Sequence, residues 1–327
     1  MKAIIYHDYG SPDVLKCEEV EKPFPKPDEV LIKVRAASVN PLDWRLMKGE
    51  PKVLRVVGRL MRLNMGRPGA DVAGEVEAVG SAVTQFKTGD AVFGSCRGAF
   101  AEYVCTSASH IATKPNALTF EQAASINVAG LTAVQGLRDK GRIQPGQKVL
   151  VNGAAGGVGT FAVQIARTFG AHVTGVCSTR NVEMVKSIGA DEAIDYTQQD
   201  FTTSSQRYDL ILDCVGNHPF SECKRVLSPH GKFIGIGAPH DVAMLPLLAR
   251  MIKDVSLSVF TSQKALTFIA KASSADLAFI AELITTGKVQ PVIDRVYSFS
   301  EAANAVRHVE EGHARGKVIV SLDPALC

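Results

Sequence analysis

The residues with the clearest chemistry in this sequence are the glycines of Gly153–Gly159, GAAGGVG. The apolar run Val149–Asn152 precedes them, Thr160–Thr168 has helical periodicity, and a second apolar run follows at His172–Cys177. Small residues let a phosphate approach the backbone, and the N–H groups and dipole of a helix N-terminus attract its charge. A strand, glycine turn, helix and strand in this order predict a dinucleotide-binding site, although Ala154 replaces the usual first glycine of GxGxxG.

The residues at the end of the second predicted strand indicate which dinucleotide is bound. An acid about 20 residues past the glycines hydrogen-bonds the ribose hydroxyl of NAD. This chain has Ser178 and Arg180 there, and its next acid is Glu183. Because a guanidinium and a hydroxyl bind a 2′-phosphate that a carboxylate would repel, the sequence favours NADPH. The alternative is that Arg180 is a solvated residue at a helix start.

Composition and charge narrow the class of protein. The chain has 327 residues, 46% hydrophobic and 21% charged, with a formal net charge of +3 that is spread along the sequence. A nucleic-acid partner is therefore not indicated. The seven cysteines stand singly and no apolar run reaches transmembrane length, so we expect a reduced, cytoplasmic protein.

The order of predicted elements indicates two domains of different class. Residues 1–122 contain short β-rich runs broken by glycine and proline, which predict an antiparallel, barrel-like domain. In residues 123–262 strands alternate with helices and end in a strand predicted at 255–260 (VSLSVF), which is typical of an α/β fold with a doubly wound parallel sheet. Residues 263–327 read as helix, strand, helix and strand, and we predict that they complete the first domain around an inserted second domain.

Several motifs follow one another as they do in a known family. They are AASVNPLDWRLMKG, PGADVAGEVEAVG, GDAVFG, GAFAEYV, AASINVAGLTAVQGL, AAGGVG, GADEAIDY and GHARGKVIV. On these motifs the whole chain resembles the medium-chain dehydrogenase/reductases, and more narrowly their zinc-free quinone oxidoreductase and alkenal/one reductase branch. The resemblance implies a GroES-like β-barrel catalytic domain, split around a Rossmann NADP-binding domain with the cofactor in the cleft between them. It also implies a homodimer built through the strand VSLSVF.

The sequence lacks the metal ligands of zinc-dependent members of that superfamily. Those members have a cysteine near the position of Asn40 and a GHE motif where this chain has Gly69, Ala70 and Asp71. Zinc needs about four N, S or O ligands, and the eight histidines here are scattered. We therefore predict no metal, and alcohol oxidation is disfavoured because nothing obvious would stabilise an alkoxide.

The resemblance also assigns residues to the site. Asn40 would face the nicotinamide ribose, Thr132 would lie near the phosphates or the nicotinamide, and Trp44 and Lys48 would form the cleft wall, whereas Asp43 would fix the loop. The candidate cofactor contacts are Gly156, Gly157, Val158 and Gly159 at the pyrophosphate; Ser178, Arg180 and Tyr196 at the 2′-phosphate; Cys214, Val215 and Gly216 on the adenosine side; Ile236, Gly237, Phe260 and Thr261 at the nicotinamide; and Arg315, Gly316 and Lys317 before the last strand. Ligands bind at the carboxyl ends of parallel strands, which supports the strand-end positions. A packing role stays open for each catalytic candidate, and the sequence names no general acid.

These expectations describe a hydride-transferring enzyme, with alternatives. NADPH would reduce a quinone or the β-carbon of an α,β-unsaturated carbonyl, while the protein supplies orientation and electrostatics. A non-catalytic NADPH-binding redox sensor or interaction protein stays open because fold does not fix function, and a zinc alcohol dehydrogenase is the weaker alternative. The apolar segments 51–68 and 241–260 suggest a lipophilic acceptor. For each segment a lid, a dimer surface and ordinary packing stay open, and these interpretations are favoured over a membrane contact.

Overall fold

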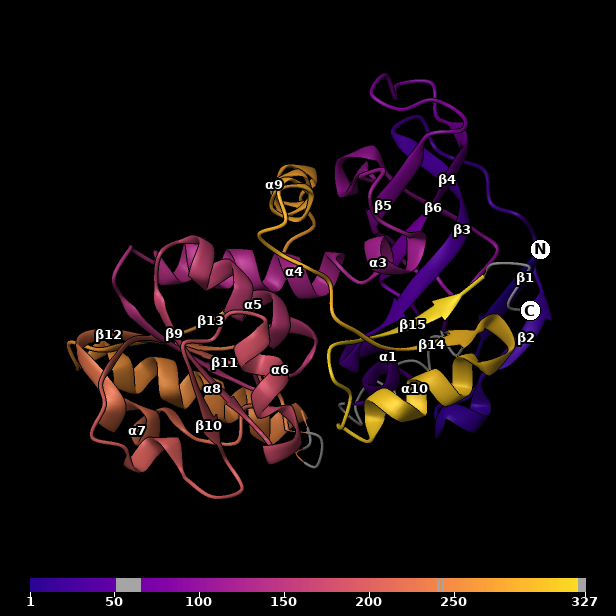
Figure 1. Ribbon diagram of the computed structural model, residues 1–327. Helices are drawn as coiled ribbons and strands as arrows, with labels where there is room; N and C mark the ends of the chain where they lie inside the picture. Colours follow the sequence, from indigo (N-terminus) through magenta and orange to yellow (C-terminus); the bar gives the residue numbers. More distant parts are fainter. Residues whose placement is uncertain (51–65, 240–241, 243, 323–327) are drawn as a thin grey trace. The chain divides into compact units, whose positions relative to one another are not determined.

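The computed structural model describes residues 1–50, 66–239, 242 and 244–322, which form two compact units (Figure 1). The first unit contains residues 1–131, 271–285 and 291–327, and the second contains residues 132–270 and 286–290. The predicted domain boundaries after residues 122 and 262 stay a proposal. The chain passes from the first compact unit to the second after residue 131, and returns to the first after residue 270. No helix among the described residues is long and apolar enough to cross a membrane.

The second unit contains a six-stranded parallel sheet whose strand order reverses once. The order is β10-β9-β8-β11-β12-β13. The strands are β8 Lys148–Asn152, β9 His172–Cys177, β10 Glu192–Asp195, β11 Tyr208–Asp213, β12 Leu227–Gly235 and β13 Lys264–Thr267. This is the order of a doubly wound dinucleotide-binding sheet, with the reversal between β8 and β11, so the predicted fold class is confirmed.

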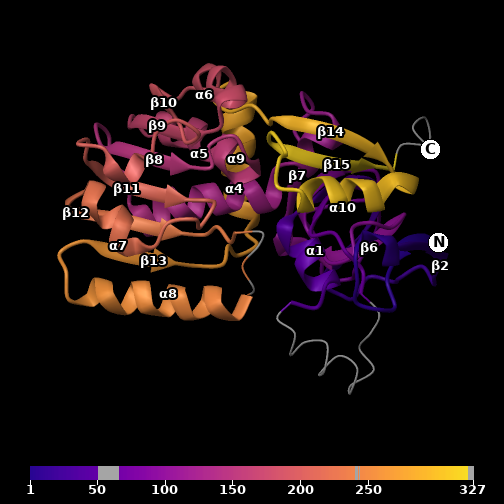
Figure 2. The ribbon, with the colours of Figure 1, turned by 90° about the horizontal axis from the view of Figure 1, so that it is seen from below.

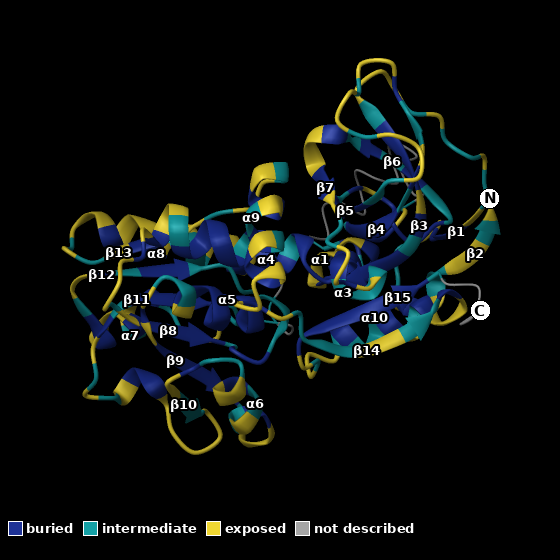
Figure 3. Ribbon diagram, turned by 45° about the horizontal axis from the view of Figure 1, so that its top comes forward, coloured by how far each residue is buried: buried dark blue, intermediate teal, exposed yellow. Residues whose placement is uncertain are grey.

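The helices of the second unit connect these strands. They are α5 Gly157–Thr168, α6 Val182–Ser187, α7 Phe220–Cys223 and α8 Met244–Val259. α5 contains the predicted helical stretch Thr160–Thr168 and begins three residues before it, and every residue from Gly159 to Ala166 is buried. Its small and apolar residues allow this burial, and β8, β9 and β11 beside it are also largely buried (Figure 3).

The strand predicted at 255–260 is wrong. Residues 255–259 form the last turns of α8, and the sixth strand of the sheet is β13, which begins at Lys264. The stretch VSLSVF alternates apolar and polar residues like a strand, but its apolar residues also continue a helical stripe that starts before it. VSLSVF is therefore not the edge strand of the sheet; β13 is, and the implied homodimer stays a prediction.

The first unit is built mainly of antiparallel β-structure. Its larger sheet has the order β14-β15-β3-β4-β5-β7, with β6 also paired to β3, and β1 pairs with β2 in a small second sheet. The strands are β1 Lys2–Ile5, β2 Lys16–Glu19, β3 Glu29–Val39, β4 Asp71–Val79, β5 Ala91–Ser95, β6 Tyr103–Ser107, β7 Ile111–Thr113, β14 Ile293–Ser298 and β15 Lys317–Ser321. β3 pairs with β6 along its first half and with β15 along its last four residues, so one long strand serves two parts of the sheet.

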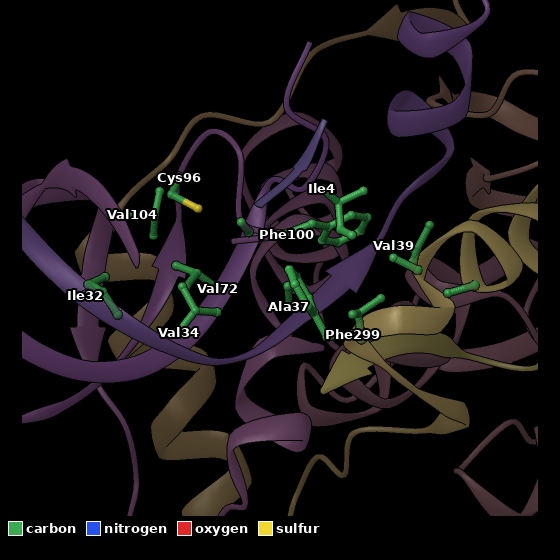
Figure 4. Close-up of a cluster of buried hydrophobic side chains, with 14 of the residues drawn as sticks. Ile4, Ile32, Val34, Ala37, Val39, Val72, Cys96, Phe100, Val104 and Phe299 are labelled. Atoms are coloured by element: carbon green, nitrogen blue, oxygen red, sulfur yellow. The ribbon is translucent and has the colours of Figure 1, made fainter. Parts of the chain in front are cut away.

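Four helices among the described residues, together with an apolar cluster, complete the first unit, and α4 Asn127–Val134 continues into the second. The helices are α1 Pro41–Met47, α3 Phe120–Ala124, α9 Ser274–Thr285 and α10 Ala302–Glu310. The cluster joins side chains from β3, β4, the segment after β5, and the turn before α10, among them Val34, Val72, Phe100 and Phe299 (Figure 4). Ser298 and Glu301 form a capping box that begins a short 3-10 turn before α10.

Candidate functional site

The glycine turn between β8 and α5 is open to a ligand at one position and closed at another. Gly153 has φ +82°, and its carbonyl accepts the Gly156 N–H at 3.0 Å. No side chain caps α5 at Gly156, and a Cβ there would meet only the Gly153 oxygen, at 3.5 Å. A Cβ at Gly159 would instead lie 2.1 Å from the same oxygen. The first turn of α5 therefore offers N–H groups to an anion, while Gly159 allows the turn to close.

Asp213 organises the neighbouring loop at the carboxyl end of β11. Its Oδ1 accepts hydrogen bonds from Nδ2 of Asn152 at 2.8 Å and from the N–H groups of Val215 at 3.1 Å and Gly216 at 2.9 Å. Burial raises the pKa of this carboxyl group. The loop Cys214–Gly216 is thus held against β8, at the reversal of strand order where doubly wound sheets bind ligands.

The residues predicted after β12 lie beside the same loop. The N–H groups of Ile236 and Gly237 donate to the Asp213 carbonyl at 3.0 and 2.9 Å. A Cβ at Gly237 would stand 2.2 Å from the Cys214 carbonyl carbon, so only glycine allows this approach. The structure therefore brings together the predicted residues of three loops, after β8, β11 and β12.

The candidate 2′-phosphate residues follow β9 and β10, which are adjacent strands. The Tyr196 N–H donates to the Cys177 carbonyl at 3.0 Å, which brings Tyr196 next to Ser178 in the sheet register. The Tyr196 side chain is 60% exposed, and Arg180 is exposed in the turn Thr179–Asn181. This edge therefore presents a guanidinium and a phenol to solvent.

An acid that the sequence analysis did not consider lies at the same edge. Asp195 ends β10, and its carboxylate accepts a hydrogen bond from Oγ1 of Thr197 at 2.8 Å. The same Thr197 Oγ1 lies within hydrogen-bond distance of Thr179 Oγ1, at 3.0 Å. Hydrogen bonding, first of all from Thr179, lowers the pKa of Asp195. An ionised carboxylate that contacts Thr179, the residue before Arg180, opposes a bound phosphate, so both charges must be weighed in choosing the cofactor.

Phe260 and Thr261 do not lie at this edge, and their predicted approach to the nicotinamide is wrong. Both precede β13, which runs parallel to β12, so they stand at the amino end of the strands. α8 has already carried the chain back across the sheet before them (Figure 2). The residues that do follow β13 are Phe268 and Ile269, and Ile269 is 91% exposed. A correct helix assignment for 244–259 would have identified them.

A separate polar network is buried in the first unit around Asp71. Neither Asp71 nor the Lys317 side chain is accessible, with exposures of 0% and 4%. The Asp71 carboxylate accepts hydrogen bonds from Ser38 Oγ, Asn40 Nδ2 (2.9 Å), Lys317 Nζ (3.3 Å), Asn127 Nδ2 (2.8 Å) and the Val128 N–H (2.9 Å). Lys317 Nζ also donates to Asn40 Oδ1 at 2.7 Å. Lys317, predicted to reach the cofactor or to close the cleft, is thus held in a buried contact with Asn40, and its role toward the cofactor stays a prediction.

Asp43 fixes the loop before α1, as expected. One carboxylate oxygen accepts the Asn40 N–H at 2.7 Å and the other accepts the Gly69 N–H at 2.8 Å. Burial outweighs these hydrogen bonds and raises the pKa of Asp43 to about 6. Asp43 thus ties the start of α1 to the residues before β4.

The other catalytic candidates have structural partners. Trp44 is 2% exposed and belongs to the apolar cluster, so the prediction that it forms a cleft wall is wrong. Lys48 forms an ion pair with Glu310 and lies 5.4 Å from the Trp44 ring centroid. Thr132 lies on α4 and is partly buried, and its role stays a prediction. Among the candidates predicted before the last strand, Gly316 is buried with φ +94° and Arg315 is exposed.

Comparison with known proteins identifies the family. Residues 26–116 match the alcohol dehydrogenase GroES-like domain, and residues 188–320 match the zinc-binding dehydrogenase domain. The chloroplast envelope quinone oxidoreductase homolog of Arabidopsis thaliana is 36% identical over 334 residues, covering 98% of this chain and 98% of that protein. The chain belongs to the medium-chain dehydrogenase/reductase superfamily. A mitochondrial NAD(P)H oxidoreductase of Mus musculus is also 36% identical, over 98% of this chain and 89% of that protein.

A solved structure agrees with this assignment. The quinone oxidoreductase from Coxiella burnetii superposes with a TM-score of 0.86 at 31% identity, covering 98% of this chain and 99% of that one. The resemblance read from the motifs is thereby confirmed. This medium-chain dehydrogenase/reductase is an oxidoreductase whose relatives include quinone oxidoreductases.

The residues of this medium-chain dehydrogenase/reductase do not fit the zinc ion that one matched domain is named for. The carboxylate of Asp71, at the position of the superfamily's zinc motif, is occupied by two amides, a hydroxyl and the buried ammonium of Lys317. Ala70 beside it offers no ligand. Across the described part of the chain, no group of three or more His, Cys, Asp or Glu residues could hold a metal ion.

Proposed function

We propose that this protein is a zinc-independent, NADPH-dependent reductase that transfers a hydride to a quinone or to the β-carbon of an α,β-unsaturated carbonyl. The uncapped N-terminus of α5, behind a glycine turn at the reversal of strand order, is the observation that carries the proposal. It fits the pyrophosphate of a dinucleotide, with Gly156, Gly157, Val158 and Gly159 as the contacts. When bound, NADPH supplies the hydride, and the chain supplies binding and orientation.

The preference for NADPH rests on Arg180. Arg180 is exposed in the turn Thr179–Asn181 that follows Ser178, and a phosphate is held by charge-assisted hydrogen bonds to a guanidinium. Asp195 is the feature that favours NADH, because a carboxylate accepts a ribose hydroxyl. We favour NADPH because Asp195 already accepts hydrogen bonds from Thr197 and Gln198.

The first unit contributes a preorganised Asn40. Its amide is held between Lys317 and Asp71, and its backbone N–H is held by Asp43. We therefore assign Asn40 a positioning role at the start of α1, rather than a catalytic one. The chain offers no assured general acid, so we propose that water or the cofactor ribose delivers the proton to the reduced acceptor.

The remaining parts of the proposal concern partners and location. A lipophilic acceptor is suggested by the apolar segments 51–68 and 241–260, of which residues 51–65, 241 and 243 lie outside the described residues. A homodimer and a cytoplasmic location stay predictions. We propose no nucleic-acid partner, because the net charge of +3 includes no basic block.

The test is oxidation of NADPH and of NADH by protein treated with a chelator. It is run with a naphthoquinone and, separately, with a medium-chain 2-alkenal. Turnover with NADPH well above that with NADH is the expected result, and the better acceptor decides between the two chemistries. Tight NADPH binding without turnover would favour the sensor alternative, and activity with alcohols that zinc restores would favour an alcohol dehydrogenase.

A further inference from the structure

Helix α8 turns two ionisable side chains toward the sheet that it covers. Arg250 is partly buried, and Asp254, one helical turn later, is only 8% exposed. The core-facing side of a surface helix is normally apolar. Burying a charged group is costly unless the group is paired and hydrogen-bonded. Both side chains have such partners, and both partners belong to the segment that follows β11.

Arg250 holds the start of that segment. Its guanidinium donates to the Gly216 carbonyl, while the Gly216 N–H donates to Oδ1 of Asp213 at 2.9 Å. Gly216 has φ +79°, and a Cβ there would lie 3.1 Å from Nη2 of Arg250 and 2.8 Å from the Gly237 carbonyl oxygen. The two polar groups of Gly216 are therefore fixed from opposite sides, one by the end of β11 and the other by α8.

Asp254 holds the end of the same segment. Its carboxylate accepts a hydrogen bond from the N–H of Phe220, the first residue of α7. The first N–H groups of a helix have no partner within it, and no side chain caps α7 at Pro219. Asp254 satisfies one of these groups. Two residues four positions apart on α8 thus fasten residues 216–220 at both ends.

The charges around this segment also compensate one another. Asp213, Arg250 and Asp254 line one cavity between α8 and the sheet. Burial raises the pKa of both carboxyl groups, and the positive charge of Arg250 opposes that rise in each of them. One guanidinium therefore serves an acid at the end of β11 and an acid on its own helix, and at the same time donates to the loop between them.

We propose that Arg250 and Asp254 are positioning residues for the cofactor, through which α8 clamps residues 214–216 in the conformation that receives the adenosine side of the dinucleotide. This inference rests on the proposed function for the identity of the ligand. Both residues act through the backbone of Gly216 and Phe220, and we assign neither a direct contact with the cofactor. A loop that is already held in one conformation loses less conformational entropy when a ligand binds, so the clamp raises affinity.

The test compares Arg250→Met with Lys253→Met. The control removes a neighbouring cation that is exposed and that also lowers the pKa of Asp254. In cofactor-free Arg250→Met, we expect hydrogen exchange, followed by NMR, to quicken roughly tenfold or more at the Val215 and Gly216 N–H groups and to stay unchanged in β8 and α5. NADPH binding, measured by calorimetry, should weaken roughly tenfold or more. Lys253→Met should equal wild type in both measurements.

Two further variants separate positioning from folding. Arg250→Lys keeps a cation and a donor, so it should recover most of the NADPH affinity. The double variant Arg250→Met with Asp254→Asn removes a cation and an acid together and keeps an acceptor for the Phe220 N–H. It therefore avoids leaving Asp254 as an uncompensated buried charge, and it should still show fast exchange at Gly216.

Three results would overturn the proposal. They are unchanged exchange at Val215 and Gly216 in Arg250→Met and in the double variant, fast exchange there with wild-type NADPH affinity, and exchange that quickens equally in β8 and α5, which would indicate general destabilisation. Wild-type protein that binds no dinucleotide would instead overturn the proposed function and with it the ligand assigned to the loop. The exchange measurement needs no cofactor, so it would still decide whether the clamp exists.

Discussion

The Nζ atom of Lys317 lies 2.7 Å from Oδ1 of Asn40, although 277 residues separate them in the chain. Asp71 is the third member of this contact, and its carboxylate accepts from both side chains. A charge pair buried this completely is stable only when its remaining hydrogen-bonding capacity is also satisfied. Ser38 and Asn127 satisfy it here, so the network acts as one unit that fixes Asn40.

Removing the lysine should expose how much the first unit depends on this network. Lys317→Met leaves the Asp71 carboxylate buried without its cation, and we expect a loss of about 3–5 kcal/mol in the free energy of unfolding. Lys22→Met breaks an ion pair of 2.7 Å with Glu77 that is about 40% exposed, and should cost far less stability than Lys317→Met, because solvent screens the pair. Urea unfolding of the two variants makes the comparison. Equal losses of unfolding free energy in the two variants would mean that the buried pair contributes no more than the exposed one. The double variant Asp71→Asn with Lys317→Met should lose less unfolding free energy than Lys317→Met alone, because no charge is then left buried without a partner.

The two glycines of the α5 turn should separate binding from stability. Gly156→Ala adds a methyl group that meets only one protein atom, at 3.5 Å, on a backbone that alanine adopts without strain. We expect an unchanged melting temperature and NADPH binding weakened roughly tenfold or more, since the methyl group would stand where the pyrophosphate approaches. Gly159→Ala forces a contact of 2.1 Å and should lower the melting temperature. Unchanged affinity in Gly156→Ala would remove the glycine turn from the proposed site.

Arg180 should carry the discrimination between the cofactors. Arg180→Ala is expected to weaken NADPH binding by roughly 10–100-fold, the equivalent of a charge-assisted hydrogen bond, and to leave NADH binding nearly unchanged. Arg207 is a matched control, because it is also exposed but precedes β11 at the amino end of the strands. Titration calorimetry with both cofactors measures the effect. An equal loss for NADPH and NADH would contradict a 2′-phosphate role.

The raised pKa of Asp43 predicts a definite dependence of stability on pH. Between the unfolded pKa of 3.8 and the folded pKa of about 6, the folded protein keeps a proton that the unfolded chain has lost. Rising pH therefore favours the unfolded state, and the contribution of Asp43 falls by about 3 kcal/mol from about pH 4 to pH 7. Asp43→Asn does not titrate, so the unfolding free energy of wild type minus that of the variant should fall by this amount. A difference that rises with pH would mean that the bonds to Asn40 and Gly69 keep the carboxylate ionised.

The sequence predicted best what local pattern alone determines. β8, α5 and β9 lie where the sequence pattern predicts them, because each combines one clear hydrophobic period with glycine at its boundary. The stretch VSLSVF has no single hydrophobic period, since its alternation fits a strand and its apolar residues also fit a helical stripe. The stripe faces solvent, and reasoning that assigns apolar residues to a core has no rule for such a helix.

The candidate site shows the same division. Loops at strand ends were found because sheet topology puts them on one edge, and Asp213 could have been added as the acid that ends an apolar strand. The partners of Lys317 could not be found, because Asn40 follows β3 and Asp71 begins β4, at sequence separations of 246 residues or more. The available signal was a lysine as the first residue of an otherwise apolar strand, β15.

The pairing of β15 with β3 has a consequence for synthesis of the chain. Val318 pairs with Val39, so the last strand of the first unit leaves the ribosome long after the strand it must join. At about 5–20 residues per second, the delay is roughly 15–60 s. During this time β3 has an open edge and Asp71 has no lysine, whereas the strands of the second unit are complete by residue 267. We therefore expect the inserted unit to fold first on the ribosome, and the nascent first unit to be the part that needs protection by chaperones.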